Sequence, residues 1–211
     1  AIMSSIDLVL EAKIDTQAQK RILEILRCQS DRLVKFVEKI VQILCLETDP
    51  AGIEREPIAL LPLIESIVND FKRGTERHHF ILLPPQTSSV IVDGEKQLIE
   101  IVLKNLLDNA IKYSPNGGPI IIEIDDGSME EIIIHVIDEG IGIAPEQQDK
   151  IFGPFYRIDG SDAQRVYGHG LGLYLAQKAV KAQGGRIWVK SKLGCGSCFS
   201  FSLPRVTENT Q

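Results

Sequence analysis

Apolar side chains recur at heptad spacing between residues 17 and 46. One heptad position holds Leu26, Leu33 and Ile40, and the other holds Ile22, Phe36 and Ile43, with Gln29 interrupting. This stripe predicts a long helix that packs against another helix. Residues 2–12 resemble the end of an earlier helix, so we expect a helical hairpin with a shortened first arm. A helix packed only on its own domain is the alternative, but such stripes more often belong to dimeric bundles.

After residue 50 the pattern mixes helices and strands, behind a polar joint, ETDPAGIEREP. Two isoleucine-rich runs, PIIIEID and EIIIHVID, predict a hairpin with DGSME as its turn. The expected helices are 61–76, 95–113 and 171–183, and the expected strands are 79–83, 90–92, 119–125, 131–138, 185–191 and 198–204. This order predicts an α/β (α+β) layered fold with a mainly antiparallel sheet. We expect two domains, 1–50 and 51–211.

Composition and charge narrow the class of protein. The 211 residues are 44% hydrophobic and 25% charged, with a net charge of −6, as in a globular protein outside membranes. The acidic balance argues against nucleic acid or an anionic membrane as the main partner. No run is long enough to span a membrane and no signal peptide is visible, so we expect a cytoplasmic protein or the cytoplasmic part of a larger one. The cysteines, whose spacing does not form a zinc site, are Cys28, Cys45, Cys195 and Cys198.

Polar residues follow one line along the helix predicted at 95–113. Asn105, Asn109 and Lys112 recur at i, i+4 and i+7, beside an apolar stripe that reads as core. A buried amide without a partner costs about 1–3 kcal/mol, so these amides need hydrogen bonds. Capping or bonds between helices would supply them. A ligand-binding face is the other hypothesis: an amide oxygen suits Mg²⁺, a lysine suits phosphate, and the Tyr113 ring suits a base.

Three glycine motifs favour the ligand hypothesis. VIDEGIGI (136–143) ends a strand at Asp138, an acceptor suited to an exocyclic amine, and its glycines permit close backbone approach. GHGLGLYLA (168–176) enters a helix, whose free N–H groups form an anion site. GCGS (194–197) is a third turn that exposes its backbone. Neither a P-loop nor a dinucleotide-binding fingerprint is present.

The ordered motifs closely resemble the N, G1, G2 and G3 boxes of the GHKL ATPase superfamily. IFGPFYR (151–157) is similar to the F box of sensor histidine kinases. The resemblance covers about residues 55–204 and implies a Bergerat-type ATP-binding sandwich. The hairpin ahead of it looks like part of the dimerisation and phosphotransfer domain of these kinases.

The resemblance implies roles for individual residues. Asn109 would bind Mg²⁺ with Asn105 nearby, and Lys112 would contact phosphate. Tyr113 would pack on adenine. Asp138 would accept the amino proton of adenine. Ser197 would support Asp138, and Gly140 and Gly142 would shape the adenine pocket. Gly168, Gly170 and Gly172 would hinge the lid and meet the phosphates. Leu171, between the last two glycines, is also implied to bind the nucleotide.

Further residues belong to the lid that the resemblance implies. Arg157 and Arg165 would each reach the γ-phosphate, although exposed lid arginines are as often only solvated. Phe152 and Phe155 are expected to be apolar anchors that dock the lid. His169 would point at phosphate, but loop histidines usually have no such role.

The resemblance implies an ATP-dependent protein-histidine kinase that passes phosphate to an aspartate of a response regulator receiver domain and forms a homodimer through the hairpin. The family's acceptor lies in an H-E-x-R-T-P-L-x-x-I box, of which Ala1-Ile2 would be the last two positions. We therefore expect the acceptor histidine upstream, and this chain alone to be unable to autophosphorylate.

Two alternatives stand beside the kinase. One is a nucleotide-sensing module without phosphotransfer. The other is a topoisomerase, mismatch-repair or chaperone ATPase, which is disfavoured because no glutamate occupies the Asn105 position to activate water.

Overall fold

The computed structural model describes residues 16–48, 54–85, 87, 90–126, 128–158 and 168–206. The chain forms two compact units, residues 1–44 and 45–211. Helix α2 (Thr16–Thr48) supplies the described part of the first unit and confirms the helix predicted at 17–46. The helix end expected at residues 2–12 lies outside the described residues. Within the described ranges, no helix is long and apolar enough to cross a membrane.

Helix α2 exposes large apolar side chains outside the predicted stripe as well as within it. Leu33, which belongs to that stripe, is 54% exposed. Other large apolar side chains on α2 are at least half exposed and lie outside the stripe: Leu23, Ile25, Val34, Val37, Val41 and Leu44. Four of these, from Val34 to Leu44, continue the 3–4 spacing of a second stripe. The helix therefore presents apolar side chains on more than one side.

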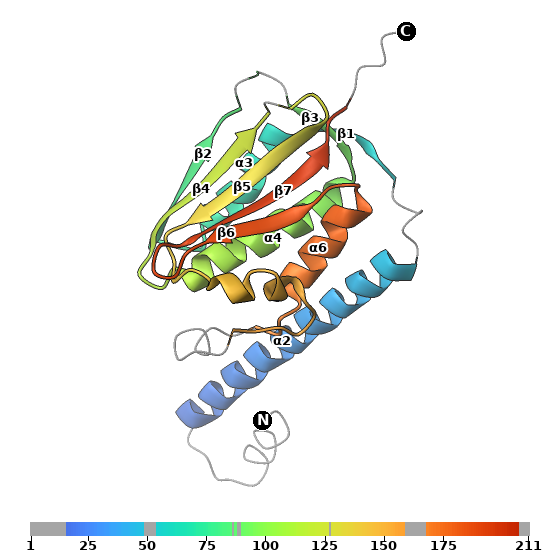
Figure 1. Ribbon diagram of the computed structural model, residues 1–211. Coiled ribbons are helices and arrows are strands. Elements are labelled where there is room, and N and C mark those ends of the chain that lie inside the picture. The colour runs from blue at the N-terminus through green and yellow to red at the C-terminus, as the bar shows by residue number, and fades with distance from the viewer. Residues whose placement is uncertain are drawn as a thin grey trace. The chain divides into compact units, whose positions relative to one another are not determined.

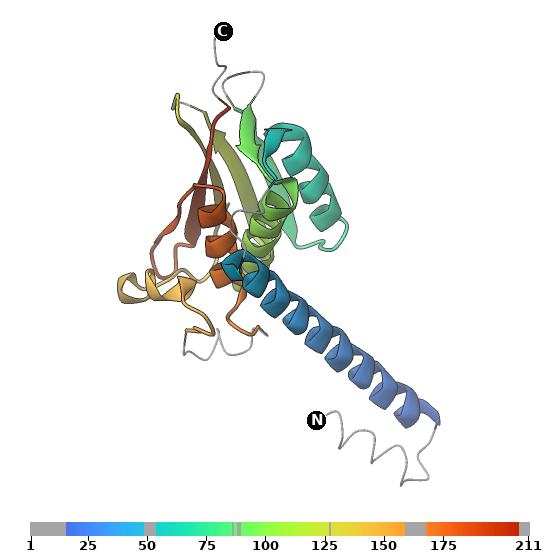
Figure 2. The same ribbon diagram turned by 90° about the vertical axis from the view of Figure 1, so that its right-hand side faces the viewer.

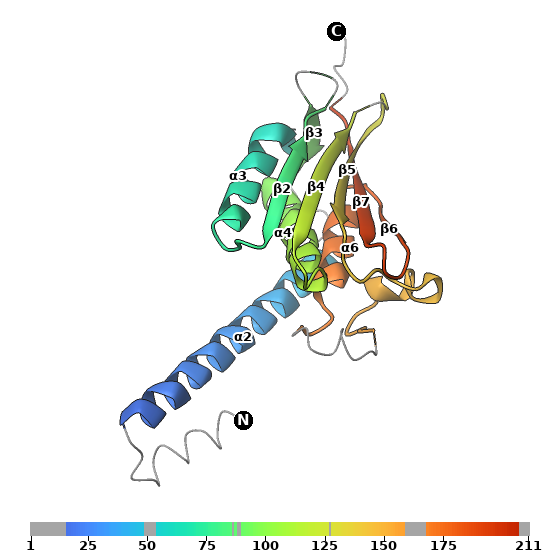
Figure 3. The same cartoon turned by 90° about the vertical axis from the view of Figure 1, so that its left-hand side faces the viewer.

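The larger unit is built on a five-stranded sheet in the order β2-β4-β5-β7-β6 (Figures 1 and 3). The strands are β2 (His78–Leu83), β4 (Gly118–Asp125), β5 (Glu131–Asp138), β6 (Ile187–Ser191) and β7 (Ser197–Pro204). β2 pairs with β4 in parallel, and the other three pairings are antiparallel. The predicted α/β (α+β) fold with a mainly antiparallel sheet is confirmed.

A second, two-stranded sheet was not predicted. β1 (Glu56–Ala59) pairs antiparallel with β3 (Ile91–Gly94), although residues 47–57 were expected to form only a polar joint. Pro57 has no N–H to donate, yet a proline is tolerated where a strand has a free edge, as in this short pair. Helix α3 (Leu60–Lys72) also ends before the predicted residue 76, because the chain turns at Gly74, whose N–H donates to the Phe71 carbonyl.

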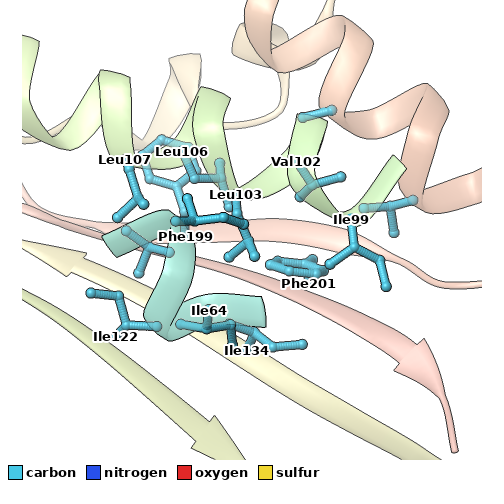
Figure 4. Close-up of a cluster of buried hydrophobic side chains, with 14 of the residues drawn as sticks. Ile64, Ile99, Val102, Leu103, Leu106, Leu107, Ile122, Ile134, Phe199 and Phe201 are labelled. Atoms are coloured by element: carbon cyan, nitrogen blue, oxygen red, sulfur yellow. The ribbon is translucent and has the colours of Figure 1, made fainter. Parts of the chain in front are cut away.

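Three helices cover one face of the five-stranded sheet: α3, α4 (Lys96–Tyr113) and α6 (Gly172–Ala182) (Figures 1 and 2). Alternate side chains of β4, β5 and β7 point into this layer and are buried, among them Ile122, Ile134 and Phe201 (Figure 4). No described helix covers the opposite face, seen in Figure 3. The hydrophobic core therefore lies between one helical layer and one sheet face.

Helix α4 contributes the predicted apolar stripe to that core. Its members are at most 1% exposed: Ile99, Val102, Leu103, Leu106 and Ala110. Figure 4 shows most of them against the sheet residues. Because this stripe is fixed on the sheet, the adjoining stripe with Asn109 is held at the border of the core.

Candidate functional site

The end of α4 is joined directly to the end of β5. The Ile141 N–H donates to the Tyr113 carbonyl at 3.0 Å. A Cβ atom at Gly140 would lie 2.2 Å from the same carbonyl oxygen and 2.7 Å from an oxygen of Asp138. Only glycine fits at position 140, where the end of α4 meets the segment after β5.

Asp138 is the last residue of β5 and is 5% exposed. The Gly140 N–H donates to its Oδ1 atom at 2.8 Å. Burial raises the pKa of the Asp138 carboxyl, and the N–H hydrogen bonds from Gly140 and Ser197 oppose this shift in part. Asp138 is therefore a desolvated acceptor held in a fixed orientation.

A cavity opens beside Asp138, between the end of α4, the ends of β5 and β7, and the segment that follows residue 150. Five of its lining residues are aliphatic and three are aromatic; the full lining is Asn109, Tyr113, Asp138, Ile141, Gly142, Ile143, Ile151, Tyr156, Arg157, Ile158, Leu173, Ser197 and Phe199. Apolar walls with a few fixed polar groups are typical of sites for flat organic ligands. Six of the predicted residues are brought together here: Asn109, Tyr113, Asp138, Gly142, Arg157 and Ser197.

The two glycine turns beside the cavity pack against each other. Gly142 has φ 71°, and a Cβ atom there would lie 2.1 Å from the Lys192 carbonyl oxygen. The Gly194 N–H donates to the Ile141 carbonyl at 2.8 Å. The turn at 194–197 therefore supports the turn after Asp138, and both glycine motifs build one wall.

Ser191 was missed by the sequence reading. Its hydroxyl donates to the Gly196 carbonyl at 2.7 Å and accepts the Ile143 N–H at 2.8 Å. It also lies 3.0 Å from the Ser197 hydroxyl. A serine at the end of a strand carries no signal of such a bridging role, which arises only when β6, β7 and the turn meet.

The two phenylalanines of the IFGPFYR segment differ in environment. Phe152 is 8% exposed and meets Phe199 edge-on, with ring centroids 6.5 Å apart. This burial agrees with the apolar environment expected for Phe152, while its docking of the lid stays a prediction. Phe155 is 64% exposed and has φ 60°, so the same prediction for Phe155 is wrong. The backbone, not the ring, holds this residue, because its N–H donates to the Gly170 carbonyl at 3.0 Å.

The segment that enters α6 is tied to the same region. Arg157 lines the cavity, and its Nη1 atom donates to the Gly168 carbonyl at 3.0 Å. Gly170 has φ 69°, and Leu171, before the first helical residue Gly172, is 3% exposed. His169 is exposed and does not line the cavity. Arg165 lies outside the described residues.

Two predicted residues of α4 are not among the cavity lining. The Asn105 amide is 9% exposed and donates to the Ile101 carbonyl at 2.8 Å, one turn earlier. Lys112 is exposed and pairs with Asp108 at 2.5 Å. Within the described ranges, no group of three or more His, Cys, Asp or Glu side chains could hold a metal ion. An ion at this site would depend on Asn109 and on groups that a ligand brings.

Known proteins share this architecture. The family described as histidine kinase-, DNA gyrase B- and HSP90-like ATPase matches residues 94–207. Sensor histidine kinase WalK of Bacillus subtilis (strain 168) is 36% identical over 187 residues, which cover 87% of this chain and 30% of WalK. The chain therefore spans less than a third of the length of that relative.

Two solved structures share the fold. Full-length ShkA in complex with AMPPNP has a TM-score of 0.76 at 21% identity, covering 96% of this chain and 42% of ShkA. Histidine kinase ThkA in complex with response regulator protein TrrA has a TM-score of 0.69 at 22% identity, covering 99% of this chain and 60% of that one. The family match alone covers more than half of the 211 residues, and this chain belongs to the histidine kinase-, DNA gyrase B- and HSP90-like ATPases.

Proposed function

We propose that this chain is the ATP-binding core of a sensor histidine kinase that passes phosphate to an aspartate of a response regulator receiver domain. Residues 51–211 would be the catalytic domain, and residues 1–50 part of the dimerisation and phosphotransfer hairpin. The observation that carries the proposal is the buried Asp138 carboxylate at an apolar cavity that Asn109 also lines. Such a kinase would act in the cytoplasm, where ATP and receiver domains are found.

Adenine recognition would rest on Asp138 and the apolar walls. A carboxylate fixed by the Gly140 N–H can accept from the exocyclic amine of adenine. Tyr113, Ile143 and Phe199 line the cavity and offer surfaces to the faces of a flat ring. Guanine presents a carbonyl oxygen at the corresponding position, which the Asp138 carboxylate would repel. The site should therefore select adenine nucleotides.

The phosphates would lie toward Asn109 and the entry of α6. This 11-residue helix begins at Gly172, and the free N–H groups of its first turn favour an anion. Asn109 offers a carboxamide oxygen to Mg²⁺, which would neutralise phosphate charge when bound with the nucleotide. Lys112, one turn further along α4, would supply a second positive charge after leaving Asp108. Arg157 would face the terminal phosphate from the other side.

Phosphoryl transfer would depend on position and charge. The transition state is loose, so the residues of the chain would orient the γ-phosphate and stabilise its oxygens. Among the residues that the structure describes, Asp138 is the one acidic side chain in the cavity lining, and it would be occupied with the base. We propose that the general base for the attacking group comes from the domain that carries the acceptor.

The kinase activity is testable with γ-labelled ATP and an acceptor domain supplied separately. A dimerisation and phosphotransfer domain that carries the family's histidine box should become labelled by this chain, with a phosphate that is acid-labile and base-stable. The chain itself should stay unlabelled, because none of its histidines lines the cavity: His78, His79, His135 and His169.

The matched control is the acceptor domain with its histidine replaced by glutamine, which should remain unlabelled. Label on a histidine of this chain, or an acceptor that stays unlabelled although ATP is bound, would contradict the proposed transfer.

We also propose a homodimer through α2. Apolar side chains on more than one side of this helix, Leu33 and Val37 among them, would be covered in a bundle of helices from two copies. Leu33→Glu should shift the protein from dimer to monomer, because a carboxylate would be buried in the seam. Lys35→Glu, at an exposed polar position of the same helix, should leave the dimer intact. Light scattering measures both masses, and equal masses for the two variants would exclude this interface.

A further inference from the structure

Figure 3 shows the sheet face that no described helix covers. A thiol, a hydroxyl and an imidazole meet on this face. The Cys198 Sγ atom lies 3.6 Å from the Ser200 hydroxyl and 3.9 Å from the His135 Nδ1 atom. The Ser200 hydroxyl and His135 Nδ1 are 2.7 Å apart. The three polar atoms thus form a hydrogen-bonded triangle of a thiol, a hydroxyl and an imidazole.

Strand register produces this cluster. His135 on β5 lies directly opposite Ser200 on β7, and Cys198 is two residues away on the same face. Ser197 and Phe199, the neighbours of Cys198, line the cavity on the other side of the sheet. The triangle is therefore separate from the nucleotide site, although one strand carries both.

Accessibility differs within the cluster in a way that suits chemistry at sulfur. Ser200 is 1% exposed, whereas Cys198 and His135 are partly exposed. Trp188 on β6 lies directly opposite Ser200 in the sheet. A small reagent can reach the partly exposed sulfur, while the Ser200 hydroxyl beside it is shielded from water.

We propose that Cys198 is the nucleophile of a modification site for small hydroperoxides, with Ser200 as proton relay and His135 as base. An adjacent base within hydrogen-bond reach is the usual means of activating such a nucleophile. The thiol proton passes to the Ser200 oxygen as the Ser200 proton passes to His135 Nδ1. This leaves a thiolate that accepts a hydrogen bond from Ser200, beside an imidazolium.

The thiolate then attacks the terminal oxygen of the hydroperoxide. A sulfur–oxygen bond forms and the oxygen–oxygen bond breaks, so sulfur is oxidised to a sulfenic acid and the peroxide is reduced. The leaving alkoxide takes the proton held by His135, through Ser200. One thiol and one hydroperoxide give one sulfenic acid and one alcohol, or water if the reagent is hydrogen peroxide.

The other cysteines provide controls within the same chain. Cys28, Cys45 and Cys195 are exposed, while Cys198 is only partly so. Of the four, Cys198 alone is hydrogen-bonded to an imidazole among the residues that the structure describes. If exposure decided the rate, the exposed cysteines, Cys195 among them, would react before Cys198. If the triangle decides it, Cys198 reacts first.

The experiment treats the full chain with limiting hydrogen peroxide in the presence of dimedone and measures the labelling rate of each cysteine by peptide mass spectrometry. Cys198 should react at least about tenfold faster than Cys195, since a positioned base contributes at least that much. His135→Gln and Ser200→Ala should each lower the Cys198 rate by about tenfold or more and leave the Cys195 rate unchanged.

Unchanged ATP affinity in both variants shows that the fold is retained, because neither residue lines the nucleotide cavity. If ATP affinity falls in one variant, the Cys198 labelling rate of the other variant tests the proposal. A Cys195 rate equal to or above that of Cys198 would overturn the proposal, as would a Cys198 rate that is unaffected in a correctly folded variant.

Discussion

Asp138→Asn should weaken ATP binding about 100-fold, which corresponds to roughly 2.7 kcal/mol and lies within the range for a lost hydrogen bond to a charged group. Asparagine has nearly the same shape, so the cavity remains. Its amide can place an NH₂ group against the Gly140 N–H or against the amine of adenine, and either contact sets donor against donor. Turning the amide relieves one clash only by creating the other.

Isothermal titration with ATP measures the loss, and Asp70→Asn is the matched control. Asp70 is an exposed carboxylate on α3 that does not line the cavity. The unmodified protein should also bind GTP about 100-fold more weakly than ATP, because the guanine carbonyl would face the carboxylate. Equal affinities of the parent and Asp138→Asn for ATP would refute the assignment of Asp138 to adenine.

Phe201→Ala should lower the free energy of unfolding by about 3–5 kcal/mol, the usual cost of removing a buried aromatic ring. Phe201 is fully buried and lies directly opposite Ile134 in the sheet. Figure 4 shows its ring beneath α4, near Ile99. The surrounding side chains come from both layers, so they cannot close the space without separating a helix from its strand.

Urea denaturation monitored by circular dichroism gives this change, and Phe155→Ala is its control. Phe155 is 64% exposed, so its loss should cost less than about 1 kcal/mol. Similar destabilisation of both variants would mean that Phe201 does not occupy the centre of the core.

Elements with strong local periodicity were predictable, and those that depend on distant partners were not. The isoleucine-rich strands β4 and β5 and the stripe of α4 follow directly from spacing. β1 is four residues long and contains Pro57, and its partner β3 lies over 30 residues away, so no local signal marks it. The parallel pairing of β2 with β4 likewise depends on the intervening helix rather than on either strand.

The residues of the candidate site also differ in whether the local sequence predicts them. Asp138, Gly140 and Gly142 could be predicted because an acid at a strand end and spaced glycines occur in order with the other glycine motifs, whereas alone they would indicate only a turn. Ser191 does not, since its role requires three segments to converge on one hydroxyl. The apolar walls of the cavity are a further example of residues without a local signal. From the sequence, Phe199 is an ordinary core residue, and only the folded structure shows that it lines the cavity with Ser197.

Ile151 and Phe199 belong to the hydrophobic core and line the cavity as well. A molecule that fills the cavity thus extends the core, so its binding raises the free energy of unfolding of the protein. A ligand at 100 times its dissociation constant contributes about 2.7 kcal/mol in this way. Fragment libraries can then be screened by the rise in melting temperature alone, with no acceptor, no signal and no catalytic assay. Compounds that bind against the apolar walls without any phosphate would be found as readily as nucleotides. The apolar side of the cavity is therefore a starting point for inhibitor chemistry.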